Sequence, residues 1–556
     1  MNEFKKMKRP EIRRHALSAA ALALCAGTWM NANAFEFDTG NDDLQVRWDN
    51  TVRYNYGYRV QGQDPVILKN INADDGDRNF APHSTVNNRV DVLSEFDVVY
   101  QKKFGARVSG AGWYDNAYSG KLDNTSLATS NHMVNGQPAL GLSDYTERYY
   151  KGPSGELLDA FVFGSFDLGT MPLSLRAGRH TVNWGEALLG GGAIHGVTYG
   201  QAPLDLAKSF ASPGIEAKEL YRPLGQVSGT LQATSELTFG GQYFFQWDAS
   251  RFPETGSYLG FNDALQNGGE SLLLAPGVRA LRGPDLTPKD SGDWGLMSRW
   301  SPMWLDGTMG FYVRNFSDKL PQVVVKATAP RQYFLTYGDD IDMYGLSLAK
   351  QIAGVSVGAD LNYRRNMPLN SDIVQITSTS ALPKAGDLLG ARGDTVHGVL
   401  NAIGSVAATP LFNSATWSSE LTWNRWTSVT QGAQYFKGRD NYTAIDKVSK
   451  DYFGLAINFT PTWYQVFPGA DLSMPLSYSV GLSGNSAVAS GGNKNAGSYG
   501  VGFGLDLYSK YRFDLKYIGY FGDYTLNAAG AIAVANGTTT YLRDRGAIFL
   551  TFKTTL

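Results

Sequence analysis

Cysteine is almost absent from this chain: the 556 residues contain one, Cys25, in an N-terminal segment that we expect to be cleaved. The mature chain can therefore form no internal disulfide bond and no cysteine-ligated metal site. A strong charge of one sign is also lacking, because the net charge is -2, which argues against a general nucleic-acid binder. The sequence has no phosphate-binding loop or His-Glu-x-x-His motif, so it predicts no enzyme.

Long apolar runs are scarce too. A mean hydropathy of -0.24 and a hydrophobic content of 43% are too polar for a bundle of membrane helices. The exception is the N-terminus, where basic residues 1–15 precede an apolar run at 16–30 and a small-x-small motif ends at Ala34. This order predicts a secretory signal peptide over residues 1–34, cleaved before Phe35. The alternative is an uncleaved anchor, but the run is shorter than the roughly 20 residues that span a bilayer.

Strict alternation of apolar and polar residues begins at Leu44. The apolar face holds Leu44, Val46, Trp48, Val52, Tyr54, Tyr56, Tyr58 and Val60, with Asn50 as its only polar member, and the polar face holds Gln45, Arg47, Asp49, Thr51, Arg53, Asn55 and Arg59. Successive side chains of a strand point to opposite faces, so this strand has one face for lipid and one for water. It is longer than the usual globular strand of about 5–6 residues, and a tilted strand that crosses a bilayer needs about 9–11. The pattern predicts the first strand of a transmembrane barrel.

The same alternation recurs along the chain, and short connections alternate with long ones, as periplasmic turns and extracellular loops do in such barrels. The predicted strands are 44–58, 86–101, 105–118, 157–167, 172–182, 224–234, 237–248, 292–302, 308–317, 341–351, 354–366, 413–424, 428–437, 451–460, 472–484, 498–509, 512–524 and 543–556. We therefore predict an all-β fold, one antiparallel barrel over 35–556 with about 18 strands, or about 16 if the pairs around 413–437 are not strands. Closure pairs 543–556 with 44–58 and places the chain in the Gram-negative outer membrane.

Several stretches resemble a known family. They are 74–80 (DDGDRNF), 88–97 (NRVDVLSEFD), 105–118 (GARVSGAGWYDNAY), 178–186 (GRHTVNWGE) and 363–369 (YRRNMPL). Together they resemble the proteobacterial outer-membrane family catalogued as domain of unknown function 1302, over essentially the whole mature chain. The resemblance implies an outer-membrane barrel but no established activity or residue roles. Members are often encoded near a periplasmic lipid-carrier-like family and large export pumps, which implies a partner of that kind and traffic in hydrophobic molecules.

The long connection 183–222 is the first candidate site. It lacks alternation, is rich in apolar residues and contains three consecutive glycines at 190–192. A loop of this length in a compact fold is usually functional or disordered. We hypothesise that it folds inward as a constriction or hatch, with Trp184 presenting an aromatic face and Glu186 facing lumen-side arginines. The alternative is an ordinary surface loop.

Charged residues on the inner face of the barrel are the second candidate site. They are Arg47, Arg53, Asp91, Glu95, Asp97, Arg107, Asp115, Asp159, Asp360 and Arg364. Facing rows of opposite charge can set up a transverse field that orients a solute. The alternative is a network of salt bridges that fills the wall.

An acidic cluster in the first outer loop is a candidate metal site. Asp74, Asp75 and Asp77 could hold a calcium ion through their carboxylate oxygens, although their spacing is not that of an EF-hand. The alternative is an acidic turn paired with Arg78. The histidines of the mature chain show no metal-ligand spacing; they are His83, His132, His180, His195 and His397.

These features favour an outer-membrane channel or transporter for small hydrophobic or amphipathic molecules, because loop 183–222 is rich in apolar residues. A water-filled diffusion porin with weak charge selectivity is the alternative. Alternatives of another class are a lipid-modifying enzyme, whose nucleophile and base the fold would have to bring together, and a surface adhesin. The expected partners are outer-membrane lipids, a small-molecule solute, the barrel assembly machinery and the periplasmic lipid-carrier-like protein. Calcium is the one cofactor considered.

Overall fold

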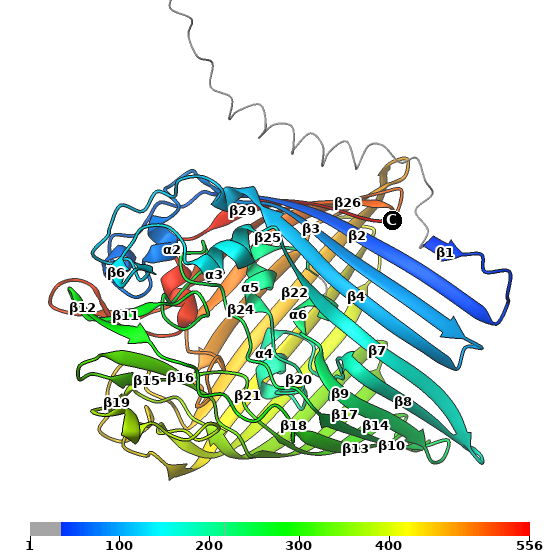
Figure 1. The fold of residues 1–556 in the computed structure, drawn as a ribbon. Helices are drawn as coiled ribbons and strands as arrows, with labels where there is room; N and C mark the ends of the chain where they lie inside the picture. The colour runs from blue at the N-terminus through cyan, green and yellow to red at the C-terminus, as the bar shows by residue number, and fades with distance from the viewer. Residues whose placement is uncertain (1–34, 216) are drawn as a thin grey trace, which may run out of the picture.

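The wall of the molecule is one closed antiparallel sheet (Figure 1). The computed structural model describes residues 35–215 and 217–556, so the expected signal peptide at 1–34 lies outside the described residues. Within those ranges the sheet has 20 strands. The short strand β1 (Phe35–Phe37) pairs with β2 but is not a wall strand, and β23 (Ala470–Ser473) and β24 (Leu476–Ser483) are two halves of one wall strand. The wall therefore has 18 strands. The barrel closes where β2 (Leu44–Arg59) pairs with β29 (Ala547–Thr555). The predicted all-β barrel is confirmed.

The other wall strands follow one another around the barrel in chain order, each paired with the next. They are β3 (Thr85–Tyr100), β4 (Phe104–Asp115), β7 (Ser154–Leu168), β8 (Met171–His180), β9 (Leu224–Gln232), β10 (Leu237–Phe244), β13 (Trp294–Trp300), β14 (Gly307–Phe316), β17 (Ile341–Ile352), β18 (Val355–Pro368), β20 (Arg392–Val406), β21 (Ser414–Gln431), β22 (Asp451–Phe467), β25 (Gly497–Leu507) and β26 (Tyr511–Phe521). Short turns such as 101–103 and 169–170 join them at one end, and long loops join them at the other.

Alternation along these strands separates an apolar outer face from a polar inner one. The outward side chains of Trp48, Val162 and Leu361 are 45%, 59% and 48% exposed, whereas the inward Arg53 and Arg364 are buried. This is the division that a period of two predicts for a wall between lipid and a polar interior. Among the described residues, no helix is long and apolar enough to cross a membrane.

The predicted strands are wrong in one region, although the total count is right. Residues 392–406 form β20, whereas the prediction places them in a loop over 367–412. The two strands predicted at 413–424 and 428–437 are one continuous strand, β21. On β20 the period is blurred because glycines stand at outward positions, where Trp417 and Trp423 of β21 cover Gly404 and Gly398. Register shifts between β20 and β21 near Asp394 break the alternation in the second half of β21.

The long loops form a second layer over one end of the barrel (Figure 1). A five-stranded sheet joins three of them, in the order β11 (Ser271–Ala275), β12 (Val278–Arg282), β16 (Gln332–Thr336), β15 (Gln322–Lys326) and β19 (Val374–Ile376). Smaller pairs are β5 (Met133–Val134) with β6 (Gln137–Pro138) and β27 (Tyr524–Leu526) with β28 (Ile532–Ala535). The helical segments are η1 (Ile67–Lys69), α2 (Asp75–Arg78), η2 (Asn116–Tyr118), α3 (Asp144–Thr146), η3 (Glu147–Lys151), α4 (Gly190–His195), α5 (Leu206–Ala211), α6 (Ala217–Leu220), η4 (Thr379–Ala381) and η5 (Thr538–Leu542). The main hydrophobic core lies where the loops meet the inside of the wall, around Trp113, Tyr149 and Ile194.

Candidate functional site

The connection between β8 and β9, residues 181–223, carries α4, α5 and α6 and is called the inner loop here. Figure 1 shows its helices between the near strands β2 to β7 and the far strands β20 to β24. α4 contacts β20, β21 and β22. The loop is therefore in contact with inward-facing side chains of the wall, and the hydrogen bonds below define how it is held.

Two carboxylates of the far wall bind backbone amides of the inner loop. Glu420 on β21 accepts hydrogen bonds from the N–H groups of Leu188 (2.8 Å), Leu189 (3.0 Å) and Gly192 (2.7 Å). Asp360 on β18 accepts from Glu186 (2.9 Å) and Val197 (3.0 Å). Hydrogen bonds to an ionised acceptor are about twice as strong as neutral ones, so these two side chains hold the start of the loop.

Glycine at 192 makes the approach to Glu420 possible. A Cβ atom on Gly192 would lie 2.4 Å from Glu420 Oε2, and one on Gly191 would lie 2.9 Å from Thr422 Cγ2. A Cβ atom on Gly190 would meet nothing within 4 Å. The three consecutive glycines therefore differ in role, because two of them bring the backbone against the wall.

Two buried arginines bind the carbonyl groups that follow α4. Arg364 Nη2 donates to Ile194 O (2.9 Å) and Gly196 O (3.0 Å). Arg314 Nη1 on β14 donates to Val197 O (2.9 Å) and Tyr199 O (2.6 Å). Ile194 belongs to the last turn of α4, where carbonyl groups have no partner within the helix, and Gly196 O also accepts from the Tyr199 N–H (3.3 Å). The guanidinium groups supply the remaining donors to this segment.

Histidine contributes one further contact to this wall. Nδ1 of His195 lies 2.9 Å from Nδ1 of His397 on β20, and Nε2 of His195 lies 2.8 Å from Gly491 O. The two histidines are 202 positions apart, so no local sequence motif could predict that they meet. The pair adds a polar contact between α4 and the wall.

The near wall binds the other end of the inner loop. Arg53 on β2 donates to Ser212 Oγ (3.0 Å) and to Glu219 Oε1 (2.6 Å). Ser212 Oγ donates to Asp91 Oδ2 on β3 (2.9 Å), and Asn87 Nδ2 donates to Ala211 O (2.6 Å). The same loop is thus attached to β2 and β3 on one side and to β14, β18, β20 and β21 on the other.

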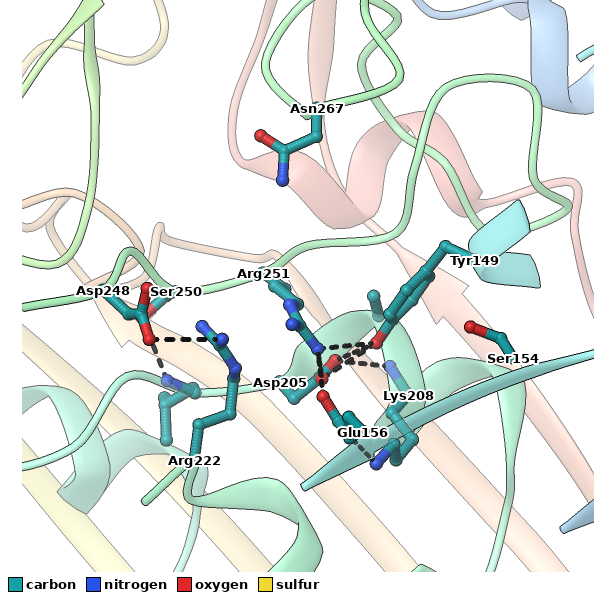
Figure 2. Close-up of polar contacts among 12 residues, drawn as sticks. Tyr149, Ser154, Glu156, Asp205, Lys208, Arg222, Asp248, Ser250, Arg251 and Asn267 are labelled. Carbon is teal, nitrogen blue, oxygen red and sulfur yellow. Dashed lines mark hydrogen bonds and ion pairs between the residues drawn. The ribbon is translucent and has the colours of Figure 1, made fainter. Parts of the chain in front are cut away.

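A polar cavity of about 240 Å³ lies between the inner loop and the outer layer. Its lining includes Tyr145, Arg222, Asp248, Arg251, Gln266 and Asn267. Figure 2 shows Arg251 between two carboxylates: its Nη1 lies 2.7 Å from Glu156 Oε2 and 2.8 Å from Asp205 Oδ2. Glu156 also pairs with Lys208 of α5, and Arg222 lies 3.5 Å from Asp248. Both guanidinium groups are therefore partly neutralised.

Tyr149 completes the cluster drawn in Figure 2. Its hydroxyl donates to Asp205 Oδ2 at 2.8 Å, and its ring lies under the guanidinium of Arg251. Burial raises the pKa of the Tyr149 phenol well above its ordinary value, so the group stays protonated and keeps donating. The site can supply donors, acceptors and an aromatic face to a small solute.

The predicted charged rows lie in two groups. Nearer the turns, Arg107 binds Asp97 through Nε (2.7 Å) and Nη2 (2.8 Å), and Arg47 lies 3.8 Å from the same carboxylate. Glu95 links this group to the inner loop through Lys218. The second group, Arg53, Asp91, Asp360 and Arg364, contacts the inner loop directly, as described above. Each residue has a polar partner, as expected for a salt-bridge network in the wall.

The remaining predicted residues have local partners. Asp115 accepts from Asn87 Nδ2 (3.0 Å) and the Asn88 N–H (2.9 Å), and Asp159 lies 3.4 Å from Ser109 Oγ. Within the inner loop, Trp184 is buried with its ring centroid 6.0 Å from that of Tyr312, so it packs on β14 and presents no aromatic face to solvent.

Glu186 accepts a hydrogen bond from Ser347 Oγ (3.3 Å), and the positive charge of Arg299 attracts its carboxylate. The expected arginine is therefore close by, but it is not the hydrogen-bond partner. The sequence analysis missed Glu420, Arg314 and Asn87. The available signal was that each of the three falls on the inward-facing side of its strand. Only contacts formed in the folded protein distinguish them from other inward-facing residues.

The acidic residues of the first outer loop separate. Asp74 and Asp75 lie beside Asp263, with one carboxylate oxygen from each within 4.8 Å of the others. Asp77 is not part of this group, because its Oδ1 lies 2.7 Å from Arg59 Nη2 in a buried ion pair. The expected set of Asp74, Asp75 and Asp77 is therefore corrected to one that contains Asp263 in place of Asp77.

Comparison with known proteins gives one family and several distant structures. No curated protein is significantly similar in sequence. Similar solved structures include OccAB2 of Acinetobacter baumannii (10% identity, TM-score 0.41, 92% of this chain and 98% of that chain). OpdK of Pseudomonas aeruginosa, solved with vanillate, gives the same values. OccAB1 of A. baumannii is 9% identical with a TM-score of 0.41, covering 94% and 98%. The family described as "Protein of unknown function (DUF1302)" matches residues 15–556, and the chain belongs to it.

Proposed function

We propose that this protein is an outer-membrane channel for small molecules in which the inner loop closes the lumen. The observation that carries the proposal is that one connection is hydrogen-bonded to both walls. Glu420 and Asp360 hold it on one side, and Arg53 holds it on the other. A barrel of this size otherwise encloses an aqueous channel, and a loop that crosses its interior narrows that channel or plugs it. The apolar outer face supports a location in the membrane, where outer-membrane lipids and the barrel assembly machinery are the partners.

The solute that we propose is small and amphipathic. The cavity of about 240 Å³ is smaller than the roughly 300–1,000 Å³ of sites for drug-sized ligands. Its lining combines Arg222, Asp248 and Gln266 with apolar and aromatic residues such as Phe252 and Tyr337. A solute with one polar end and one apolar end matches such a mixed surface. Delivery by a periplasmic lipid-carrier-like partner is compatible with that class of solute.

A water-filled diffusion porin is the second candidate, and a specific observation favours it. In the half of the lumen nearer the turns, Arg47 keeps half of its side-chain surface exposed and Arg107 keeps 29%. Exposed charges of both signs on the inner wall are typical of a hydrated passage. The two candidates differ in whether the inner loop stays in place while solute passes.

Conductance of the refolded barrel in a planar bilayer tests the proposal. We compare the native protein with a variant in which 188–212 is replaced by a short Gly-Ser linker. The matched control deletes 378–385, an exposed stretch of the outer loop between β18 and β20. Little current from native protein and control, with a steady open conductance from the variant, is the expected result. An unchanged conductance in a folded variant would refute closure by the inner loop, and a large native conductance would favour the porin.

A further inference from the structure

Three aspartates meet beneath the outer loops, away from the inner loop. Asp74 and Asp75 belong to the loop between β2 and β3, at the start of α2, and Asp263 belongs to the loop between β10 and β13. One oxygen from each carboxylate lies within 4.8 Å of the others. Asp74 and Asp263 are 0% exposed and Asp75 is 3% exposed, so the three carboxyl groups are shielded from bulk water.

The hydrogen bonds of this cluster account for some of its oxygens. Asp75 accepts from Asn124 Nδ2 (3.2 Å) and from the Asn131 N–H (2.8 Å). Asp263 Oδ2 accepts from the Asp75 N–H (3.2 Å), and Asp74 Oδ2 pairs with Arg78. Asp74 Oδ1 and Asp263 Oδ1 are buried and receive no hydrogen bond of normal geometry, and the Thr129 hydroxyl and the Asp74 N–H only weakly stabilise the charges of the two groups. These two oxygens are the observation that an acidic turn does not explain.

The charge of the cluster is also incompletely balanced. Among the described residues, Arg78 is the only cation that forms an ion pair with the cluster, and Arg279 and Arg545 act on Asp75 and Asp263 from further away. Burial raises the pKa of Asp75 well above its ordinary value, and burial together with the charge of a neighbouring carboxylate raises that of Asp263 to about 7. Buried carboxylates of this kind either take up protons or coordinate a cation.

We propose that Asp74, Asp75 and Asp263 bind a divalent cation of the calcium class. All the ligand atoms are oxygens, which suit a hard cation, whereas structural zinc sites are built mainly from cysteine and histidine. Ca²⁺ accepts irregular sets of carboxylate oxygens more readily than Mg²⁺, which demands near-octahedral geometry. One carboxylate oxygen from each aspartate becomes a ligand, and the repulsion among three buried charges becomes attraction to the ion.

Such an ion would join three outer loops. Asp74 and Asp75 come from the first loop, Asn124 and Asn131 connect the loop between β4 and β7, and Asp263 brings the loop between β10 and β13. That third loop also supplies part of the lining of the polar cavity a few residues further on, at 266 and 267. Cation binding would therefore stabilise both the outer layer and one side of the cavity.

Calorimetric titration with CaCl₂ tests this on the full barrel, refolded into detergent without lipopolysaccharide and stripped with EDTA. Native protein is compared with Asp263→Asn and with the control Asp372→Asn, an outer-loop aspartate paired with Arg439 at 2.6 Å. We expect one saturable Ca²⁺ per chain in native protein and control, and binding at least tenfold weaker in Asp263→Asn. A parallel titration with MgCl₂ should give weaker binding.

The thermal unfolding temperature gives the second readout. Ca²⁺ should raise it in the native protein and the control but not in Asp263→Asn, while in EDTA the variant should be at least as stable as native protein because one buried charge is gone. Absence of saturable Ca²⁺ binding to native protein would overturn the proposal, and so would equal binding by Asp263→Asn. If Asp263→Asn does not refold, as judged by migration on unheated gels, Asp75→Asn takes its place in the same comparison.

Discussion

Replacing Glu420 by alanine removes the acceptor for three backbone N–H groups of the inner loop, at 2.8, 3.0 and 2.7 Å. A hydrogen bond to a charged group contributes about 1.5–3 kcal/mol, and the three share one carboxylate whose own burial is costly. We therefore expect the loop to lose about 3 kcal/mol of attachment in total, less than three independent bonds would give. Because about 1.4 kcal/mol corresponds to a tenfold change, the ratio of open to closed loop should rise roughly a hundredfold.

Single-channel recording measures this as open probability. Glu420→Gln keeps one acceptor oxygen without the charge, so its open probability should lie between those of native protein and Glu420→Ala. The control is Asp514→Asn, because Asp514 pairs with Arg512 on its own strand and makes no hydrogen bond to the described residues of the inner loop. Native-like open probability in a folded Glu420→Ala barrel would refute the reasoning that this carboxylate holds the loop closed.

Three further predictions concern the same contacts and the outer loops. The single variant Arg53→Leu breaks a buried ion pair with Glu219, so it should lower the free energy of unfolding of the barrel by about 3–5 kcal/mol in denaturant titrations. The double variant with Glu219→Leu should recover most of that loss, and equal instability of the single and double variants would contradict this. Gly192→Ala should raise the open probability because its Cβ would lie 2.4 Å from the Glu420 carboxylate, whereas Gly190→Ala, with nothing within 4 Å, should not. Similar effects of the two variants would argue against a close approach of the loop backbone at 192 to the wall. The pKa of Asp263 is raised from 3.8 to about 7, so in EDTA this residue favours the folded state while its carboxyl group is protonated. Its contribution to the free energy of unfolding should be complete below about pH 4 and should be lost as the pH rises through 7. Unfolding temperatures measured across this range should show that loss in native protein and less of it in Asp263→Asn.

Most of the barrel could be predicted because its strands obey a simple rule. Each wall strand faces lipid on one side, so an apolar residue at every second position is a physical requirement that the sequence must display. The stretch from Leu44 to Val60 shows it at every second position except Asn50. On β20 the rule fails locally, because Gly398 and Gly404 occupy outward positions and tryptophans from the neighbouring strand cover them. The apolar surface is present there, but another strand provides it.

The sites were harder to predict because they depend on contacts between distant segments. Length and lack of alternation singled out the inner loop, but nothing local identifies Glu420, which is 228 positions from Gly192. Likewise Asp263 is 188 positions from Asp75, so the acidic cluster could only be guessed from the neighbours Asp74 and Asp77. The alternation of each strand predicts which charged residues face inward. Their hydrogen-bond partners depend on how the inner loop folds against the wall, and the sequence pattern does not show that.

A reversible covalent lock between the inner loop and the wall tests the central claim most directly. A Cβ atom on Gly191 would lie 2.9 Å from Thr422 Cγ2 and 3.4 Å from Thr422 Oγ1, so Gly191→Cys with Thr422→Cys is positioned for a disulfide bond. The expected mature chain contains no other cysteine to compete. The pair is introduced into the Glu420→Ala background, and current is recorded before and after a reductant is added. Almost no current is expected while the disulfide bond is formed, and frequent openings are expected once it is reduced. A steady open-pore current with the bridge demonstrably intact would contradict the claim that the inner loop closes the lumen.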